Sequence, residues 1–549
     1  MSATGIYGLS GSGIDVESLV KVGMMSKQNQ YDKLYKQEVK NEWIKEAYSS
    51  LYSDLQTFNS STMYNYKLSS TTNPQTASST DTKVATATAN ASAAAMSHNV
   101  TVNSMSSNAY LLTATDGIAR NSSSAEKSIY LSDVIDVSGW KEGDSLSFTI
   151  GNGLKTTDKE GKEIDDVKTI TLTYEDIVTK KQTLNDLAAA IKNNSNEKNK
   201  LAENNITASY DATNDAFTIY NKDGGADNKI NITANDDKAA ELLNHLGLGA
   251  VTQNTDGTTS LGSAISFTKD VTSEAVAGTD ASVTIDGKNY TSTSNKVSAG
   301  GVTYTFNAVG STTVSVTQDT DKIIENVKQF VTDYNKMIDS LNGKYYEEKY
   351  SDYSVLTKSQ ESAMTQDQID KWNEKAKSGL LYHDQTVGKL ISAMREAIYT
   401  PVDSVDSQYN SMSAIGITSS TNRGHLTLDE DKLKKALAAD PDCVYQIFSS
   451  SGDVTNSNGE TTTDYDSEGV VNRITDKINT YMKDMKSYAG TSTETSDGSS
   501  LGTLIEQLKT KMSNFKSMMD AYETALYKKY DSMETTIQQL ISQSSLFSS

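Results

Sequence analysis

The chain has 549 residues, beyond the size at which one hydrophobic core keeps growing, so we expect roughly two to four domains. Its net charge of −21, from 50 basic and 71 acidic residues, argues against nucleic acid or an anionic membrane as the main partner. A single cysteine, Cys443, excludes an internal disulfide framework and a thiolate metal cluster. No apolar run approaches the length of about 18 residues that predicts a membrane-spanning helix.

The N-terminal segment is predicted to be helical from residue 15 to residue 66. An apolar stripe with spacings of four and three residues runs along its second half: Ile44, Tyr48, Leu51, Leu55 and Phe58. Such a stripe is the face that a helix turns toward a partner helix in a coiled coil. Pro74, within the Ser/Thr-rich run 69–82, is expected to close this helical region.

Residues 83–320 are rich in Ser, Thr, Asn, Asp and Gly, with short runs in which apolar and polar residues alternate. This alternation predicts half-buried strands. Their apolar residues are Val100, Val102, Leu146, Phe148, Ile150, Ile170, Leu172, Tyr174, Phe217, Ile219, Ile230, Ile232, Val283, Ile285, Val302, Tyr304, Phe306, Val314 and Val316. We expect a turn at Gly151-Asn152-Gly153, a two-residue hairpin at Asp286-Gly287, and short helices at 184–191 and 236–246.

Helix returns at residue 321. Its apolar seam keeps spacings of three and four residues without a break: Ile324, Val327, Val331, Tyr334, Ile338 and Leu341. Shorter amphipathic helices are predicted at 387–398, 431–439 and 470–488. A last helix follows the Gly/Ser/Thr loop 490–500 and carries the stripe Leu508, Met512, Phe515, Met519, Tyr522, Leu526, Met533, Ile537 and Leu540. At about 1.5 Å per residue, this helix forms a rod of roughly 60 Å.

The predicted fold is therefore α+β and multi-domain, with two β-rich modules inserted between helical segments from both ends of the chain. We divide it into an N-terminal coiled-coil arm, two parts of a helical stem around the β-rich region, and a C-terminal coiled-coil arm. The N-terminal arm covers 1–40 and the C-terminal arm 490–549. The two parts of the stem cover 41–82 and 321–489. The β-rich region covers 83–320, with the second module inserted at about 135–250.

The apolar stripes need partners, because leaving them in water costs about 25 cal/mol per Å². For Ile44–Phe58 and Ile324–Leu341 we expect packing against each other within the chain. For the outermost segments 18–35 and 501–540 we expect contacts with other molecules, because the chain offers little else to cover them.

The sequence offers no catalytic constellation. None of His98, His245, His383 and His425 has another ligand at metal spacing, and Cys443 has no histidine in a recognisable motif beside it. The glycine-rich run 8–13 lacks the Gly-Lys-Ser/Thr ending of a phosphate loop. We therefore expect neither an enzyme nor a bound cofactor or metal.

Three stretches of the chain resemble one known family. The start, Gly8-Leu9-Ser10-Gly11-Ser12-Gly13-Ile14-Asp15 through Leu19-Val20, is similar to its N-terminal Gly-Ser-Gly-(Leu/Ile)-Asp-x-x-x-Leu-Val signature. Residues 313–335, ending in Phe330-Val331-Thr332-Asp333-Tyr334-Asn335, resemble its strand-to-helix junction. The third stretch joins Ile415-Gly416-Ile417-Thr418 with 426–433 and 444–448. On these motifs the chain is identified as a member of the flagellar hook-associated protein 2 family, whose proteins cap the bacterial flagellar filament.

The resemblance implies a secreted protein at the distal filament tip that promotes folding and insertion of exported flagellin and prevents its loss. It implies a ring-like homo-oligomer of about five subunits, contacts with flagellin and the hook–filament junction protein, and an export chaperone at the C-terminus. Residues 1–20 agree with export without a cleaved signal, since they lack the basic start and apolar block of a signal peptide. The expected contacts to the filament or between subunits are Ile14, Asp15, Leu19, Val20, Leu508, Met512, Phe515, Met519, Tyr522, Leu526, Met533, Ile537 and Leu540.

Two other functions stay open from the sequence. Flagellin and the hook–filament junction proteins also combine helical termini with β-rich middles. A surface adhesin whose β modules bind host glycans, through aromatic residues such as Tyr290 and Tyr304, is compatible with the same composition and with capping.

Overall fold

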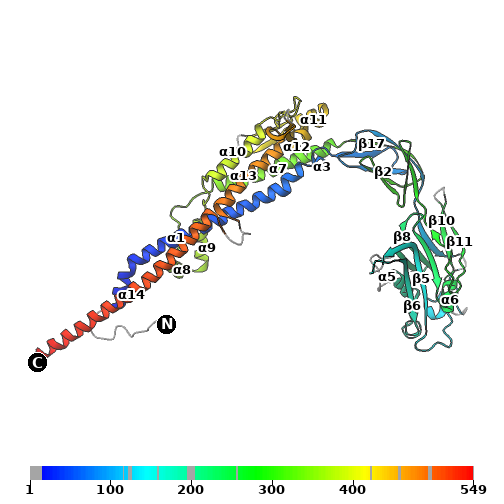
Figure 1. The fold of residues 1–549 in the computed structure, drawn as a ribbon, viewed down its shortest axis with the longest axis horizontal. Helices are drawn as coiled ribbons and strands as arrows, with labels where there is room; N and C mark the ends of the chain where they lie inside the picture. The colour runs from blue at the N-terminus through cyan, green and yellow to red at the C-terminus, as the bar shows by residue number, and fades with distance from the viewer. Residues whose placement is uncertain are drawn as a thin grey trace. The chain divides into compact units, whose positions relative to one another are not determined.

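The computed structural model describes residues 15–114, 117–121, 127–157, 160–193, 205–254, 258–420, 423–455, 459–491 and 497–547. The chain forms two compact units (Figure 1). Unit 1 combines residues 1–74 with 320–549, and unit 2 is the continuous stretch 75–319. This is the predicted α+β multi-domain fold, with helices from both ends of the chain and a β-rich region between them.

Unit 1 is mostly helical. Its helices are α1 (Val16–Thr57), a π-helical turn η1 (Phe58–Met63), α2 (Tyr64–Tyr66), α3 (Ser69–Thr72), α7 (Thr320–Tyr345), α8 (Lys358–Ser362), α9 (Gln366–Lys377), α10 (Gln385–Tyr399), α11 (Glu430–Ala439), α12 (Cys443–Ser449), α13 (Val470–Ala489) and α14 (Ser500–Phe547). Two small hairpins complete it: β18 (Ile417–Ser419) with β19 (Leu426–Leu428), and β20 (Ser451–Thr455) with β21 (Thr461–Glu468). No helix among the described residues is both long enough and apolar enough to cross a membrane.

The predicted seams of unit 1 meet in one core. Tyr48, Leu51, Leu55 and Phe58 from the first seam are buried together with Ile324, Val327, Tyr334, Ile338 and Leu341 from the second, and Ile44 and Val331 pack against this core half-buried. The helices do not pair simply, however. Along its length α1 packs mainly on α13 and α14, while α7 packs on α10 and α11. A heptad spacing marks the buried face of each helix and leaves its neighbour unspecified.

Arg473 crosses the core of unit 1 as a fully buried cation. Its side chain, 0% exposed, donates from Nε to the carbonyl of Tyr465 at 2.8 Å and from Nη1 to that of Thr400 at 2.6 Å. Nη2 donates to the carbonyls of Pro401 at 2.7 Å and Asp466 at 2.8 Å. The guanidinium also lies 5.2 Å from the centre of the Tyr465 ring. One side chain on α13 thus fixes the end of α10 and the strand β21.

Unit 2 is built from antiparallel strands. One sheet has the order β1 (Gln75–Ser79), β17 (Gly310–Gln318), β3 (Ser97–Ser104), β13 (Ala281–Ile285), β14 (Lys288–Ser292), and a smaller one β15 (Lys296–Ala299), β16 (Val302–Phe306), β2 (Ala85–Ala89). The others are β11 (Thr259–Ala264), β10 (Leu248–Gln253), β4 (Asn108–Thr113), β8 (Ala216–Gly224), β7 (Ile206–Asp211), and β12 (Val276–Ala277), β9 (Lys229–Ala234), β5 (Ser145–Thr157), β6 (Glu163–Thr173). Its helices are α4 (Leu131–Val134), the π-helical turn η3 (Glu175–Thr179), α5 (Leu184–Asn193) and α6 (Asp237–Leu246).

Unit 2 holds two separate cores, as two β-rich modules require. One core uses residues of 84–102 and 281–316, and the other lies between them in sequence, within 109–267. The predicted hairpin at Asp286-Gly287 is confirmed, because Ile285 pairs with Lys288 and both turn residues have positive φ, of 49° and 79°. The predicted turn at Gly151-Asn152-Gly153 is wrong. These residues lie inside β5, in a bulge where the buried Asn152 donates to Asp166 at 2.6 Å.

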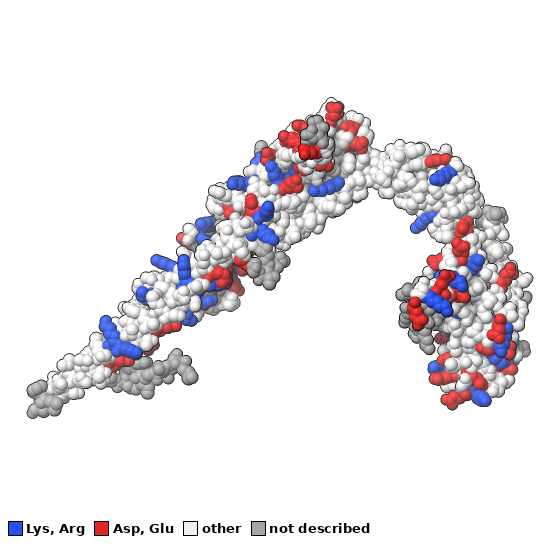
Figure 2. All heavy atoms as spheres, in the orientation of Figure 1, with Lys and Arg blue, Asp and Glu red and all other residues white. Residues whose placement is uncertain are grey.

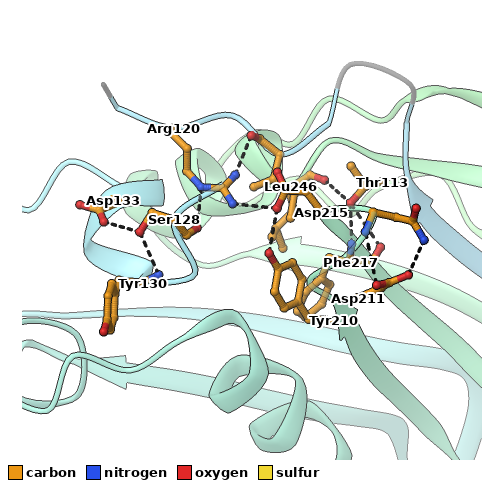
Figure 3. Close-up of polar contacts among 12 residues, drawn as sticks. Thr113, Arg120, Ser128, Tyr130, Asp133, Tyr210, Asp211, Asp215, Phe217 and Leu246 are labelled. Atoms are coloured by element: carbon orange, nitrogen blue, oxygen red, sulfur yellow. Dashed lines mark hydrogen bonds and ion pairs between the residues drawn. The ribbon is translucent and has the colours of Figure 1, made fainter. Parts of the chain in front are cut away.

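Beside these strands, a buried arginine fastens a loop to the β7–β8 turn (Figure 3). Arg120 donates from Nε to the carbonyl of Ser128 at 2.8 Å and from Nη2 to the carboxylate of Asp215, also at 2.8 Å. The Tyr210 hydroxyl donates to the same carboxylate at 2.9 Å. Because these groups are shielded from water, the network holds the turn in one position.

Candidate functional site

The two terminal helices pack against each other over much of their length, α1 beside α14 (Figure 1). The pairing is antiparallel. Lys45 forms an ion pair with Asp497. Further toward the start of α1, the Lys27 ammonium lies 5.8 Å from the centroid of the Tyr522 ring. The start of α1 then contacts Leu526. The first and the last helix of the chain together form a terminal coiled coil.

The two helices approach each other closely near the start of α1. Asp15 caps this helix, accepting the Ser18 amide at 3.0 Å, and the Ser18 hydroxyl and amide together hold the pKa of Asp15 below its usual value. Val16, Val20 and Leu526 form a small buried cluster. At Gly23 an added Cβ would lie 2.8 Å from a methyl group of Leu526, so glycine permits this approach.

A charged group sits inside the same helix pair. Glu38 is 6% exposed and lies 3.7 Å from Lys509, which also pairs with Glu42 at 3.0 Å. Burial first, and the neighbouring Glu42 second, raise the pKa of Glu38. The coil therefore carries an acidic group whose ionised form is disfavoured by its surroundings.

The residues expected to bind partners divide into three sets. Val20, Leu508, Met519 and Leu526 are buried; Met512, Phe515 and Ile537 are half-buried; Asp15, Leu19, Tyr522, Met533 and Leu540 are exposed. Ile14 lies outside the described residues. The expectation that the terminal stripes lack an intrachain partner is wrong for most of their length, because α1 covers α14. Periodicity alone could not show this, since the two helices are separated by most of the sequence.

Among the described residues, α1 does not reach the last part of α14. The pairing is antiparallel and α1 begins at Val16, whose cluster reaches no further along α14 than Tyr530. The rest of α14 therefore runs past α1 (Figure 1). The apolar stripe nevertheless continues, with Leu540 59% and the unpredicted Ile541 55% exposed, and Met533 exposed as well. We call Met533, Ile537, Leu540 and Ile541 the distal stripe.

A groove of about 710 Å³ opens between the two helices, with Ser359 of α8 in its lining. It is lined by Glu17, Val20, Lys21, Met24, Met25, Gln28, Tyr31, Ser359, Lys516, Met519, Asp520, Glu523 and Tyr527. Three of these are methionines, whose flexible side chains adapt to different partner surfaces. Sequence reasoning missed Met24, Met25 and the exposed Val22, which lie between the apolar start of the first helix, 16–20, and the polar stretch 26–30.

The described residues contain no cluster of three or more His, Cys, Asp or Glu side chains that could hold a metal ion. Cys443 is buried, and burial raises the pKa of its thiol to about 12. His98 and His425 each bind one carboxylate, of Asp286 and Asp339. What the geometry offers is a set of apolar surfaces on helices.

Comparison with known proteins places these helices in a family context. A sequence model of the flagellar hook-associated protein 2 N-terminus matches residues 12–109, and one of its C-terminus matches residues 278–542. The chain is 31% identical to flagellar hook-associated protein 2 of Halalkalibacterium halodurans over 261 residues, 45% of this chain and 49% of that protein. It is 26% identical to that of Thermotoga maritima over 281 residues, 48% of this chain and 40% of that protein. The chain thus spans about half the length of the curated relatives it matches.

Among solved structures, the flagellar cap protein FliD D1-D2-D3 domains from Escherichia coli are similar at 19% identity. That match covers 84% of this chain and 99% of the other, with a TM-score of 0.47. The two family models match both ends of the chain and together cover about two thirds of it. The chain belongs to the flagellar hook-associated protein 2 family.

Proposed function

We propose that this protein caps the distal end of a bacterial flagellar filament as a ring-like homo-oligomer. It promotes the folding and insertion of exported flagellin and prevents its loss to the medium. The observation that carries the proposal is the distal stripe, an apolar helix surface that continues past the end of the covering helix α1. Membership of the family supports it.

The mechanism needs no chemical step. The distal stripe and the groove beside Met24 and Met519 pack on helices of flagellin or of the hook–filament junction protein. Before assembly, an export chaperone covers the C-terminal end. Interfaces of modest apolar area rimmed by polar groups dissociate readily, so the cap releases each subunit once it is inserted.

The test replaces the distal stripe. In a strain that lacks the gene, a triple variant Met533→Asp, Leu540→Asp, Ile541→Asp should leave filaments short and flagellin in the medium. Carboxylates cannot be buried against an apolar partner without a large desolvation cost. Filament length is measured by electron microscopy and secreted flagellin by immunoblot.

The matched control places the same charges elsewhere on the same helix, at the exposed Ser532, Thr535 and Gln539. This variant should support normal filaments. Normal filaments from the stripe variant, or equal defects in both, would contradict the proposal. Purified protein separates the alternatives, because a flagellin or junction protein would extend into filaments or short tubes, whereas a cap forms small rings.

A second candidate function, adhesion to host glycans, is favoured by one groove of about 430 Å³ on unit 2. Tyr110 and Tyr220 meet there edge to face, with their ring centroids 6.3 Å apart, beside Asn108 and Gln253. Aromatic faces with amide groups suit sugar rings. Tyr304, named for this role from the sequence, is fully buried and cannot serve. A glycan array compares the wild type with Tyr220→Ala, and the variant should bind glycans more weakly. Equal binding signals would contradict the adhesion function.

A further inference from the structure

A second groove of unit 1 lies away from the terminal coiled coil, between the end of α7, α10 and α13. It has a volume of about 920 Å³. Its lining is Asn342, Tyr345, Tyr346, His383, Gln385, Gly388, Lys389, Ile391, Ser392, Ala393, Arg395, Glu396, Lys477 and Tyr481. Aromatic and basic side chains dominate this list, although the chain as a whole is acidic.

Two cations of the groove form no ion pair with a carboxylate in the part of the chain that the structure describes. Glu396, the one acidic residue of the lining, lies 3.6 Å from Lys477 and so compensates that lysine. Within the described residues, Lys389 and Arg395 have no carboxylate within 4.0 Å. Elsewhere in unit 1, exposed lysines such as Lys371 do have one, here Asp367 at 2.8 Å. The groove is therefore a local site of positive charge.

The aromatic wall of the groove is firmly positioned. Tyr345 and Tyr346 meet edge to face at 4.8 Å, and His383 packs on both rings. Gly388 makes room for this wall, because a Cβ there would lie 2.8 Å from the Tyr345 ring. Arg423 stacks on Tyr346 at 4.4 Å and adds a further cation at the rim.

The aliphatic part of the Arg395 side chain is held in place as well, while its guanidinium can still bind a partner. An added Cβ on Gly424 would lie 2.9 Å from Cδ of Arg395, which shows how closely the arginine chain packs on this glycine. The guanidinium itself makes no hydrogen bond among the described residues. A pre-positioned guanidinium binds a carboxylate with two parallel hydrogen bonds at little loss of entropy.

We propose that this groove binds an acidic polypeptide segment of a partner protein. Carboxylates of the segment pair with Arg395 and Lys389, and its apolar or aromatic side chains pack on the tyrosine wall. A nucleic acid fits less well, because the chain as a whole carries a net charge of −21 and acidic side chains are spread among the basic ones on the face that Figure 2 shows, so a long run of phosphates is repelled outside the groove. The proposal concerns a surface separate from the distal stripe and does not depend on the cap function.

The experiment uses the purified full-length protein and a fluorescently labelled peptide of alternating Glu and Ser with one Tyr. Binding is followed by fluorescence anisotropy at low salt. The double variant Lys389→Glu, Arg395→Glu should weaken binding at least about tenfold, since both charge pairs become repulsive. The charge-neutral variant Ser392→Trp, which fills the groove from α10, should weaken it as well. Circular dichroism verifies that each variant is folded.

The matched control is Lys322→Glu, Lys371→Glu, which changes the net charge equally at exposed positions of unit 1 outside the groove. It should lose far less affinity than the groove variant. Equal losses in the two double variants, or equal binding of a peptide with Gln in place of Glu, would overturn the proposal. Stronger binding of a single-stranded oligonucleotide at the same residues would overturn it in favour of nucleic acid.

Discussion

Replacing the buried Arg473 by methionine should destabilise unit 1 by about 4 kcal/mol. Methionine fills much of the same volume but donates no hydrogen bond, so four carbonyl groups lose their donor. At about 1 kcal/mol net for each hydrogen bond, the four add to this value. Arg473→Lys should be milder, because an ammonium keeps the charge and reaches some of the carbonyls.

Urea unfolding of the full-length protein measures the effect. Circular dichroism at the helical band follows unit 1. With Trp43 and Trp372 of unit 1 replaced by Phe, fluorescence of Trp140 follows unit 2, whose transition should not move. Lys477→Met is the matched control, because this neighbouring cation on α13 is only partly buried and should cost less than about 1 kcal/mol. A helical transition that Arg473→Met leaves unchanged, or lowers no more than Lys477→Met, would refute the reasoning.

Three further predictions concern single groups. Leu526→Ala should loosen the contact with Val20 by about 2–4 kcal/mol, seen as faster amide hydrogen exchange at the start of α1 and in the facing part of α14, with the core of unit 1 unchanged. The pKa of Glu38 is raised above 4.5, so its ionised form weakens the terminal coiled coil. As the pH falls toward 4.5, the wild type should therefore gain stability relative to Glu38→Gln. Thermal melts across this pH range measure the difference. Hydrogen bonds from the His98 side chain and the Asn99 amide lower the pKa of Asp286. The carboxylate therefore stabilises unit 2 above pH 3.8, and this effect is lost as the pH falls through its lowered pKa. Asp286→Asn should lower the melting temperature of unit 2 at neutral pH and make little difference in acid. An Asp286→Asn effect that persists below the usual aspartate pKa would contradict the last of these.

Local patterns predicted the elements of the fold well. Helices and strands repeat apolar residues at intervals that backbone geometry sets, so the seam ending at Leu341 and the strand pair around Asp286-Gly287 could be read directly. A glycine in the sequence indicates an unusual backbone conformation but does not specify whether it is a turn or a bulge. At Gly151 and Gly153 the sequence suggested a turn, but the structure has a bulge stabilised by a bond to Asp166 from the partner strand.

The contacts that decide the sites are not local. Arg473 lies just after two buried valines on an amphipathic helix. It binds the carbonyls of Thr400 and Pro401, which are distant in sequence, so nothing in its neighbourhood marks it as buried. The groove that contains Lys389 and Arg395 is formed by residues of three helices, α7, α10 and α13. Likewise, the pairing of α1 with α14 could not be read from two stripes that each fit several partners. The distal stripe was predicted in part, because Met533 and Leu540 continue the heptad spacing.

The pairing of Gln75 with Gln318 at the base of unit 2 has a consequence for how the chain folds. Unit 1 is discontinuous, and bringing α1 to α7 across a free loop of about 240 residues would cost roughly 5 kcal/mol of chain entropy. Unit 2 is continuous in sequence and joins its own first and last strands, so once it is folded that loop is already closed. We therefore expect the β-rich unit to form first and the two ends of the chain to meet afterwards, with α1 completing its coil only when the last helix, α14, is free to join it.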